Sequence, residues 1–311
     1  MKPIAITVVC LVALFLASCG ADKYMKRGEK ELALGEYFDA AADFKQAYQK
    51  TPPKERQARG AIARRMAFCY DKSLQTGKAI VAYRNAIRYK ADRGTDHLAL
   101  ARLFMRNGNY KDAAAEFQVA LDSMPGHGMA KAGLEAARRA PEIRQVGSRY
   151  TVKRLDELNG RRADYSPMLL GDDADEIYFT STRKEAEGDE LSGITGMKPG
   201  DIFYSTKDDK GKWTKPVAVT GVNSAYDEGA CSFSPDGREM YLTQCVTDPS
   251  SPRYAKIMKA DRADASWGKP SVVELSRDTL SSFAHPAVSP DGEWLYFTSD
   301  MPGGMGGLDL W

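Results

Sequence analysis

The chain has 311 residues, of which 43% are hydrophobic and 28% are charged, an ordinary soluble composition and a length sufficient for two domains. Its formal net charge of +2 conceals an asymmetry: residues 20–140 hold 23 Lys and Arg against 14 Asp and Glu, and residues 141–311 hold 20 against 28. The basic residues are spread through the first half rather than clustered, which argues against a partner made of nucleic acid.

Residues 1–18 are predicted to be a lipoprotein signal peptide. A short positive start precedes an apolar segment, residues 4–16, which is too short to span a bilayer and fits a secretory signal. The sequence Leu-Ala-Ser-Cys at residues 16–19 resembles a bacterial lipobox, in which the cysteine is diacylated and becomes the mature N-terminus. The pattern predicts lipidation of Cys19, and because an aspartate comes only at Asp22, the outer membrane is favoured. A plain signal peptide with an incidental cysteine is the alternative.

Three further cysteines raise the question of a disulfide, because their number is odd for an oxidising compartment. Cys231 and Cys245 flank a Ser-Pro-Asp-Gly turn. A turn centred on residues 235–238 places Cys231 opposite Leu242, which leaves Cys245 roughly 10 Å out of register along its strand. That offset exceeds the reach of a disulfide, although a bulge could correct it, so both outcomes stay open. Cys69 is expected to be a small core residue.

Residues 19–140 are predicted to form a tetratricopeptide (TPR) helical solenoid. Small residues, aromatic residues and prolines recur with an offset of 39 residues from the first unit to the second and 34 from the second to the third. The first unit carries Gly28, Gly35, Tyr37, Ala40, Phe44, Ala47 and Pro52, the second Ala67, Tyr70, Ala79, Tyr83 and Ala86, and the third Ala101, Gly108, Tyr110, Ala113, Phe117, Ala120 and Pro125. A helix over residues 128–140 is expected to cap the last unit.

The first helix of each TPR pair is expected to line a concave face that binds a partner. The spacing places six residues there: Arg64, Phe68, Lys72, Leu98, Arg102 and Arg106. A mixture of cations and exposed apolar side chains suits an acidic peptide segment or a helix of another protein. A solvated basic groove, or one filled by the acidic half of the same chain, is the alternative.

Residues 141–164 are predicted to be a linker between the two halves. An apolar alternation within it, formed by Tyr150, Val152, Leu155 and Leu158, is compatible with a short strand.

Residues 165–311 are predicted to form about two and a half blades of a WD40-like (PD40) β-propeller, so the fold class is α followed by all-β. Residues 230–243 (ACSFSPDGREMYLT) and 284–298 (AHPAVSPDGEWLYFT) are copies of one strand–turn–strand unit, and a degenerate copy, YSPMLLGDDADEIYFT, lies upstream. Tyr241 and Tyr296 occupy matching places 55 residues apart, and a period of about 50 residues built from short strands is typical of blades.

Turn residues support the blade prediction. Each Ser-Pro-Asp-Gly turn places a proline where it presets the turn and a glycine, Gly237 or Gly292, where positive φ is expected. Asp201 and Asp309 begin equivalent third strands.

No catalytic constellation is recognised. His97, His127 and His285 have no metal-ligand partner four residues further on, and the acidic run at residues 172–176 lacks the spacing of a calcium loop. The glycine run at residues 303–307 lacks the Lys-Ser/Thr of a P-loop. The sequence therefore predicts neither an enzyme nor a cofactor or metal site.

The succession of lipobox, TPR array and blades with SPDG, YFTS and DLW segments resembles the outer-membrane lipoproteins that combine TPR repeats, a PD40 β-propeller and an OmpA-like domain. The resemblance covers residues 19–311. It implies a non-catalytic periplasmic scaffold, held by its lipid at the periplasmic face of the outer membrane. Such a scaffold links the proteins of a type IX secretion system to the cell wall, and it holds peptidoglycan through an OmpA-like domain that these residues do not contain.

Two other functions stay open at this point. A propeller can bind a carbohydrate or a metabolite for uptake or sensing, and aromatic side chains converging on one loop face would indicate this. The chain could also be the non-catalytic half of an enzyme whose active domain lies elsewhere.

Overall fold

The computed structural model describes residues 20–171, 173–246, 254–264, 266–278 and 280–311. It divides into two compact units, of which the first reaches to Thr151 and includes Gly193–Gly196, and the second comprises Val152–Ser192 and Met197–Trp311. The predicted lipidation site, Cys19, lies outside the described residues. Helices make up the first unit and antiparallel sheets the second.

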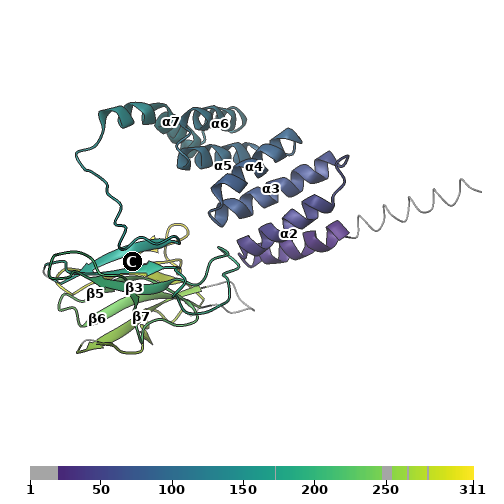
Figure 1. Ribbon diagram of the computed structural model, residues 1–311. Coiled ribbons are helices and arrows are strands. Elements are labelled where there is room, and N and C mark those ends of the chain that lie inside the picture. Colours follow the sequence, from purple (N-terminus) through teal and green to yellow (C-terminus); the bar gives the residue numbers. More distant parts are fainter. Residues whose placement is uncertain (1–19, 172, 247–253, 265, 279) are drawn as a thin grey trace, which may run out of the picture. The chain divides into compact units, whose positions relative to one another are not determined.

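The first unit consists of successive antiparallel helices (Figure 1). After a helix described over residues 20–33, the order is α2 (Tyr37–Lys50), α3 (Arg56–Lys72), α4 (Thr76–Arg88), α5 (Gly94–Arg106), α6 (Tyr110–Ser123) and α7 (Gly128–Val146). From α2 to α7, each helix packs against the next along the chain. The N-terminal region is therefore TPR-like, as its repeat period predicts.

The repeat residues form the core of this unit. Phe44 and Phe117 are 0% and 2% exposed, and the repeat alanines around them are buried. Gly28 is required beside Phe44, because a Cβ there would lie 2.9 Å from the ring. Gly35 and Gly108 have φ of 78° and 72°, so they leave their helices in the left-handed conformation that glycine adopts most easily.

Helix α7 is longer than the sequence predicts. It was expected to end at residue 140, but it continues through Pro141 to Val146. A proline at this position removes one hydrogen bond near the end of the helix, and the next four residues (Glu, Ile, Arg and Gln) include good helix formers. Gly147, with φ 74°, ends the helix. The first residues of the predicted linker therefore belong to α7.

The apolar alternation in the predicted linker does not form a strand. Tyr150 and Val152 are 81% and 95% exposed, and the described residues from 147 to 163 contain no strand. Leu158 alone is buried, in a cluster with Phe179 and Phe203. Because no neighbouring strand pairs with this segment, the alternation lacks the hydrogen bonds that would hold it extended.

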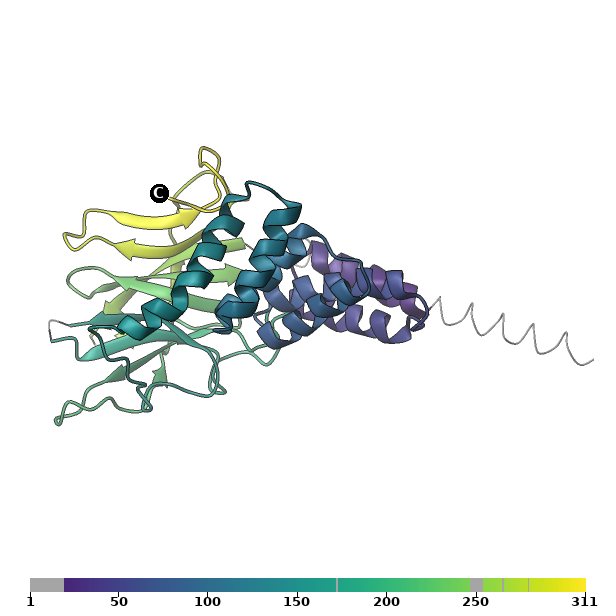
Figure 2. The same cartoon turned by 90° about the horizontal axis from the view of Figure 1, so that it is seen from above.

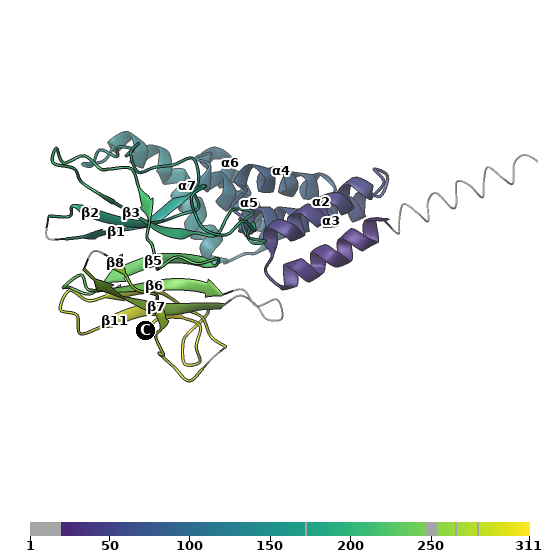
Figure 3. The same ribbon diagram turned by 60° about the horizontal axis from the view of Figure 1, so that its bottom comes forward.

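The second unit contains three antiparallel sheets, shown in teal, green and yellow in Figure 2. The first has the order β1 (Asp164–Leu170), β2 (Glu176–Ser181), β3 (Asp201–Thr206) and β4 (Val217–Ala218). The second contains β5 (Asp227–Phe233), β6 (Glu239–Val246) and β7 (Tyr254–Ala263), with the short β8 (Ser266–Trp267) and β9 (Ser271–Val272) paired to β7. The third contains β10 (Phe283–Val288), β11 (Leu295–Ser299) and β12 (Asp309–Leu310). Strand β5 contacts the first sheet and β10 contacts the second, so the sheets follow one another, as Figure 3 also shows.

The two strand–turn–strand copies are the hairpins β5–β6 and β10–β11. Gly237 and Gly292 have φ of 66° and 75°, as predicted, and each donates its N–H at 2.9 Å to the carbonyl of the serine that opens the turn. Both hairpins, and β1–β2 as well, contain a bulge in their first strand. A non-glycine residue with positive φ lies in each bulge: Ser166, Ala230 and His285. The three hairpins are thus copies of one structure.

Cys231 and Cys245 are not bridged in the structure. Cys245 pairs with Asp227, and Cys231 lies inside the bulge between Gly229 and Ser232. The bulge does not correct the register offset between the two cysteines.

Candidate functional site

The predicted partner-binding residues occupy one face of α3 and one of α5. Arg64, Phe68 and Lys72 follow one another every four residues on α3, and the three residues predicted on α5 do the same. Residues at this spacing lie on one side of a helix. Together with the start of α6 and with α7, these positions form a surface that we call the helical face, and it has two parts with different chemistry.

The first part, which we call the paired end, consists of Arg64, Asp71, Asp96 and Arg106. Two ion pairs cross between α3 and α5, with Arg64 4.0 Å from an Asp96 oxygen and Arg106 3.3 Å from an Asp71 oxygen. Arg106 also donates to the Thr76 hydroxyl at 3.4 Å. Two of the four predicted cations are therefore already neutralised, and they join adjacent repeats.

Asp96 is fixed in this arrangement by its own helix start. Its carboxylate accepts the backbone N–H of Arg93 at 2.7 Å. Burial raises the pKa of Asp96, and the bond from Arg93 and the charge of Arg64 oppose that rise. The charge of Arg64 therefore offsets part of the cost of burying the Asp96 carboxylate.

Phe68 and Lys72 lie beside the paired end on α3. Phe68 is 40% exposed and meets the Tyr37 ring edge-on at 6.1 Å, and the Lys72 ammonium lies 5.5 Å from the Phe68 ring centre, a cation–π arrangement. The prediction of an exposed apolar residue holds for Phe68. It is wrong for Leu98, which is 9% exposed and belongs to the core, because α5 packs against α4, α6 and α7 and buries a wider stripe than expected.

The second part of the surface is a groove between α5, the start of α6 and α7. Arg102 is exposed on α5 and makes no ion pair with any residue that the structure describes. Three residues further on, Met105 forms one wall of a hollow of about 720 Å³. We call this hollow the α7 groove; its principal lining residues are Met105, Tyr110, Ala132, Ala136, Arg139 and Ile143.

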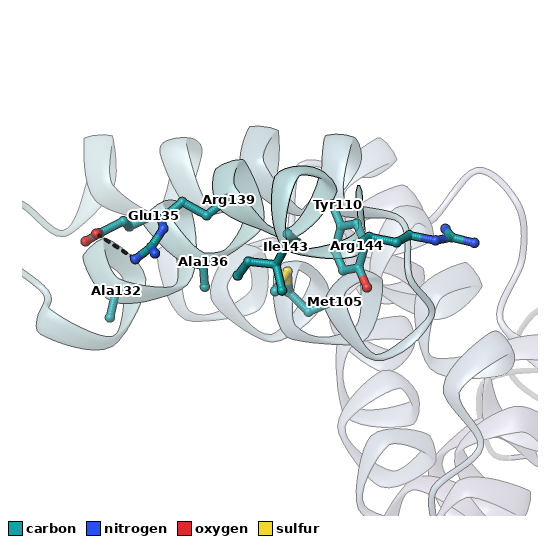
Figure 4. A pocket seen from close by; sticks show the side chains of 9 residues that line it. Met105, Tyr110, Ala132, Glu135, Ala136, Arg139, Ile143 and Arg144 are labelled. Atoms are coloured by element: carbon teal, nitrogen blue, oxygen red, sulfur yellow. Dashed lines mark ion pairs between the residues drawn. The ribbon is translucent and has the colours of Figure 1, made fainter. Parts of the chain in front are cut away.

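The α7 groove is apolar at its centre. Ile143 is 60% exposed, and Figure 4 shows it close to Met105 and Tyr110. The alanines of α7 add only methyl groups to this surface, which leaves space above the helix. Covering this apolar surface with a partner removes it from water, which is favourable.

The rim of the α7 groove is basic. A second hollow of about 610 Å³ shares Tyr110 and Arg144 with it and adds Lys111. Within the described chain, neither Lys111 nor Arg144 forms an ion pair, and Arg144 extends away from the apolar centre (Figure 4). Arg139 meets Glu135 at 3.9 Å, with both side chains more than half exposed, a weak pair in water.

Sequence reasoning missed α7 as part of the site, although a signal was present. The TPR period of 34 residues carries the predicted positions 98, 102 and 106 onto Ala132, Ala136 and Ala140, all three of which line the groove. The helix over residues 128–140 was predicted only to cap the last unit. In the structure these alanines line the groove instead.

His97 is the most unusual titratable group of the helical unit. Its ring lies between Glu116, 2.6 Å from Nδ1, and Asp92, 3.0 Å from Nε2. Burial lowers the pKa of His97, but the hydrogen bonds to the two carboxylates outweigh it and leave that pKa above its ordinary value. The arrangement links α5 to α6, the helix whose first residue, Tyr110, lines the α7 groove.

The described residues contain no group of three or more His, Cys, Asp or Glu able to hold a metal ion. None of the described helices is both long enough and apolar enough to cross a membrane.

No family model matches this sequence, and no curated protein does so either. Among solved structures, the chain is similar to the TPR domain of Sgt2 from Aspergillus fumigatus, with 22% identity, 45% of this chain and 91% of that one covered, and a TM-score of 0.35. It is also similar to the Yersinia enterocolitica type III secretion chaperone SycD in complex with a peptide of the translocator YopD, with 13% identity, coverage of 39% and 93%, and a TM-score of 0.33. The function proposed next rests on the geometry of the helical face itself.

Proposed function

We propose that the protein is a non-enzymatic scaffold whose helical unit binds a segment of another protein. The observation that carries this proposal is the α7 groove, in which an apolar centre open to water is bordered by cations without ion-pair partners among the described residues. Such a surface has more to gain from a protein partner than from solvent. The paired end then holds the repeats in the register that shapes the groove.

The β unit is proposed to be part of a WD40-like propeller. Three equivalent hairpins, each with a bulge and two with a Ser-Pro-Asp-Gly turn, support one repeating blade. Together with the lipobox at Cys19, this supports assignment to the PorE-like TPR–PD40–OmpA-like lipoproteins. The proposed role is a lipid-anchored scaffold at the periplasmic face of the outer membrane, which connects a type IX secretion machinery to the cell wall.

The test of this function is recovery of partners from cell envelopes. Tagged full-length protein is cross-linked in cells and purified beside the variant Ala136→Arg, which fills the α7 groove. We expect envelope secretion proteins to accompany the wild type and to be lost from the variant, while both fractionate with the outer membrane. Equal recovery from both proteins would contradict the proposed docking site.

Carbohydrate binding by the β unit is less well supported. A hollow of about 350 Å³ does bring Tyr178, Tyr204 and Trp267 together. However, Trp267 donates to the Tyr178 hydroxyl, which in turn donates to Glu176 at 3.1 Å, and Arg262 lies 5.5 Å from the Trp267 ring centre. These polar groups and the indole ring already have partners within the fold, which favours packing over recognition of a sugar.

A further inference from the structure

We infer that the α7 groove binds an acidic amphipathic helix of a partner protein, with a bulky apolar side chain of that helix inserted between Met105, Tyr110 and Ile143. This inference rests on the proposed function and specifies the chemistry of the partner. The shape of the groove, its apolar centre and the charge of its rim all favour such a helix.

The form of the surface favours a helix over an extended peptide. The floor of the groove is a stripe of small residues, Ala132, Ala136 and Ala140, which runs for roughly 12 Å along α7. Backbone groups inside a helix bond within that helix, so α7 offers no N–H or C=O with which a buried strand could pair. A partner helix satisfies its own backbone, and small residues let two helices approach closely.

The apolar centre fixes where the partner inserts a side chain. Ile143 and Met105 come from different helices and meet beside Tyr110 (Figure 4). The hollow of about 720 Å³ in front of them admits a leucine, methionine or phenylalanine side chain. Aromatic and long aliphatic anchors that fill such hollows supply most of the affinity of a helix for a groove.

The charge of the rim selects an acidic helix. Of the ionisable residues that line the two connected hollows, Lys111, Arg139 and Arg144 are cationic and Glu135 is anionic. Lys111 and Arg144 lie at the same end, where the two hollows meet beside Tyr110. Carboxylates of the partner helix that face this end gain attraction without displacing an existing ion pair. A basic helix would meet repulsion at the same place.

The experiment is a selection of peptides against the full-length protein. A library of random peptides of about 16 residues, some four turns of helix, is panned on the wild type. Binding of the selected peptides is then measured on Ile143→Asp, on the double variant Lys111→Glu, Arg144→Glu, and on Phe68→Asp and Arg102→Glu. Matched controls are Val81→Asp, since Val81 on α4 is 60% exposed like Ile143, and Arg138→Glu, an exposed arginine of α7 outside the lining.

We expect the selected peptides to combine Asp or Glu with Leu, Met or Phe at helical spacing and to bind roughly tenfold or more weakly to both groove variants. The control variants are expected to bind them as the wild type does. Peptides that are not acidic, or that bind equally to Ile143→Asp, overturn the inference. If binding instead depends on Phe68 or Arg102, the helical face still binds proteins and only the inference fails. If binding depends on no residue of the helical face, the proposed function fails with it.

Discussion

The paired end and the α7 groove differ in what their charges do. At the paired end, Arg64 and Arg106 each form an ion pair with an aspartate of the neighbouring repeat, which neutralises their charge within the fold. At the α7 groove, Lys111 and Arg144 form no ion pair in the described part of the chain and border an exposed isoleucine. In sequence both surfaces carry basic residues of the helical repeats, and the counter-ions of Arg64 and Arg106 become visible only in the folded structure. A cation in a TPR-like array is therefore a candidate for binding only where the neighbouring repeat does not supply its counter-ion.

The largest expected effect comes from removing the support of the α7 groove. Phe117 of α6 is 2% exposed, and a Cβ at Gly133 of α7 would lie 2.4 Å from its ring, so this ring seats α7. Phe117→Ala should lower the free energy of unfolding by about 3–5 kcal/mol and abolish partner binding. Urea unfolding followed by circular dichroism at 222 nm measures the first effect. A loss below about 1 kcal/mol would show that α7 is held by other contacts.

The second prediction separates the two ends by reversing charge at each. Arg64→Glu combined with Arg106→Glu leaves Asp96 and Asp71 facing like charges, so stability should fall by roughly 1–2 kcal/mol, a modest value because the arginines are partly exposed. Lys111→Glu combined with Arg144→Glu should leave stability within about 0.5 kcal/mol of the wild type and weaken partner binding. Urea unfolding and a binding titration, run on both variants, give the two readouts. The opposite pattern would reverse the roles assigned to the two ends.

The third prediction concerns pH. Hydrogen bonds to Glu116 and Asp92 raise the pKa of His97 in the folded state. The stabilisation is therefore fully present below the ordinary histidine pKa of about 6.5 and is lost as pH rises through the folded pKa. Helical stability should fall between roughly pH 6 and pH 8 in the wild type, and less so in His97→Gln. Equal slopes in both proteins, measured by urea unfolding at 222 nm, would exclude His97 as the cause.

A control for that measurement exists in the second unit. All four tryptophans lie between Trp213 and Trp311, so their fluorescence follows the β unit alone. Burial raises the pKa of Asp201 to about 7, which makes the β unit lose stability as pH rises from about 4 toward 7. Asp201→Asn should reduce the pH dependence of stability measured by tryptophan fluorescence. It should leave unchanged the pH dependence of helical stability, measured at 222 nm, that is attributed to His97.

The smallest expected effect belongs to Arg102, which lies between the two ends. Arg102 is exposed and has no ion-pair partner among the described residues. It does not line the groove itself, and the lining residue nearest to it in sequence is Met105. Arg102→Glu should weaken binding of an acidic partner a few-fold at low salt, and the effect should disappear at about 0.5 M salt, where exposed charges are screened. A salt-independent loss would mean that Arg102 contacts the partner directly in a buried position.

The repeat patterns predicted the elements of both units well, because they rest on local geometry. Small residues opposite Phe44 and Phe117 and glycine at turns such as Gly237 are required wherever those structures form. The site was predicted less well, because it depends on contacts between repeats that no local pattern encodes. Leu98 was expected to be exposed and is covered by neighbouring helices, and the cations of the paired end have their counter-ions on the first helix of the adjacent repeat. Ile143 was assigned to the linker, whose predicted first residues belong to α7.

The measurement that tests the central claim most directly is photo-cross-linking in living cells. A photoreactive amino acid replaces Ala136 in the α7 groove, Phe68 beside the paired end, or Val81 on α4, each in the full-length chain. We expect one partner protein to be captured strongly from position 136, weakly at most from position 68, and not from position 81. Capture of a partner from position 68 or position 81, with none from position 136, would contradict it.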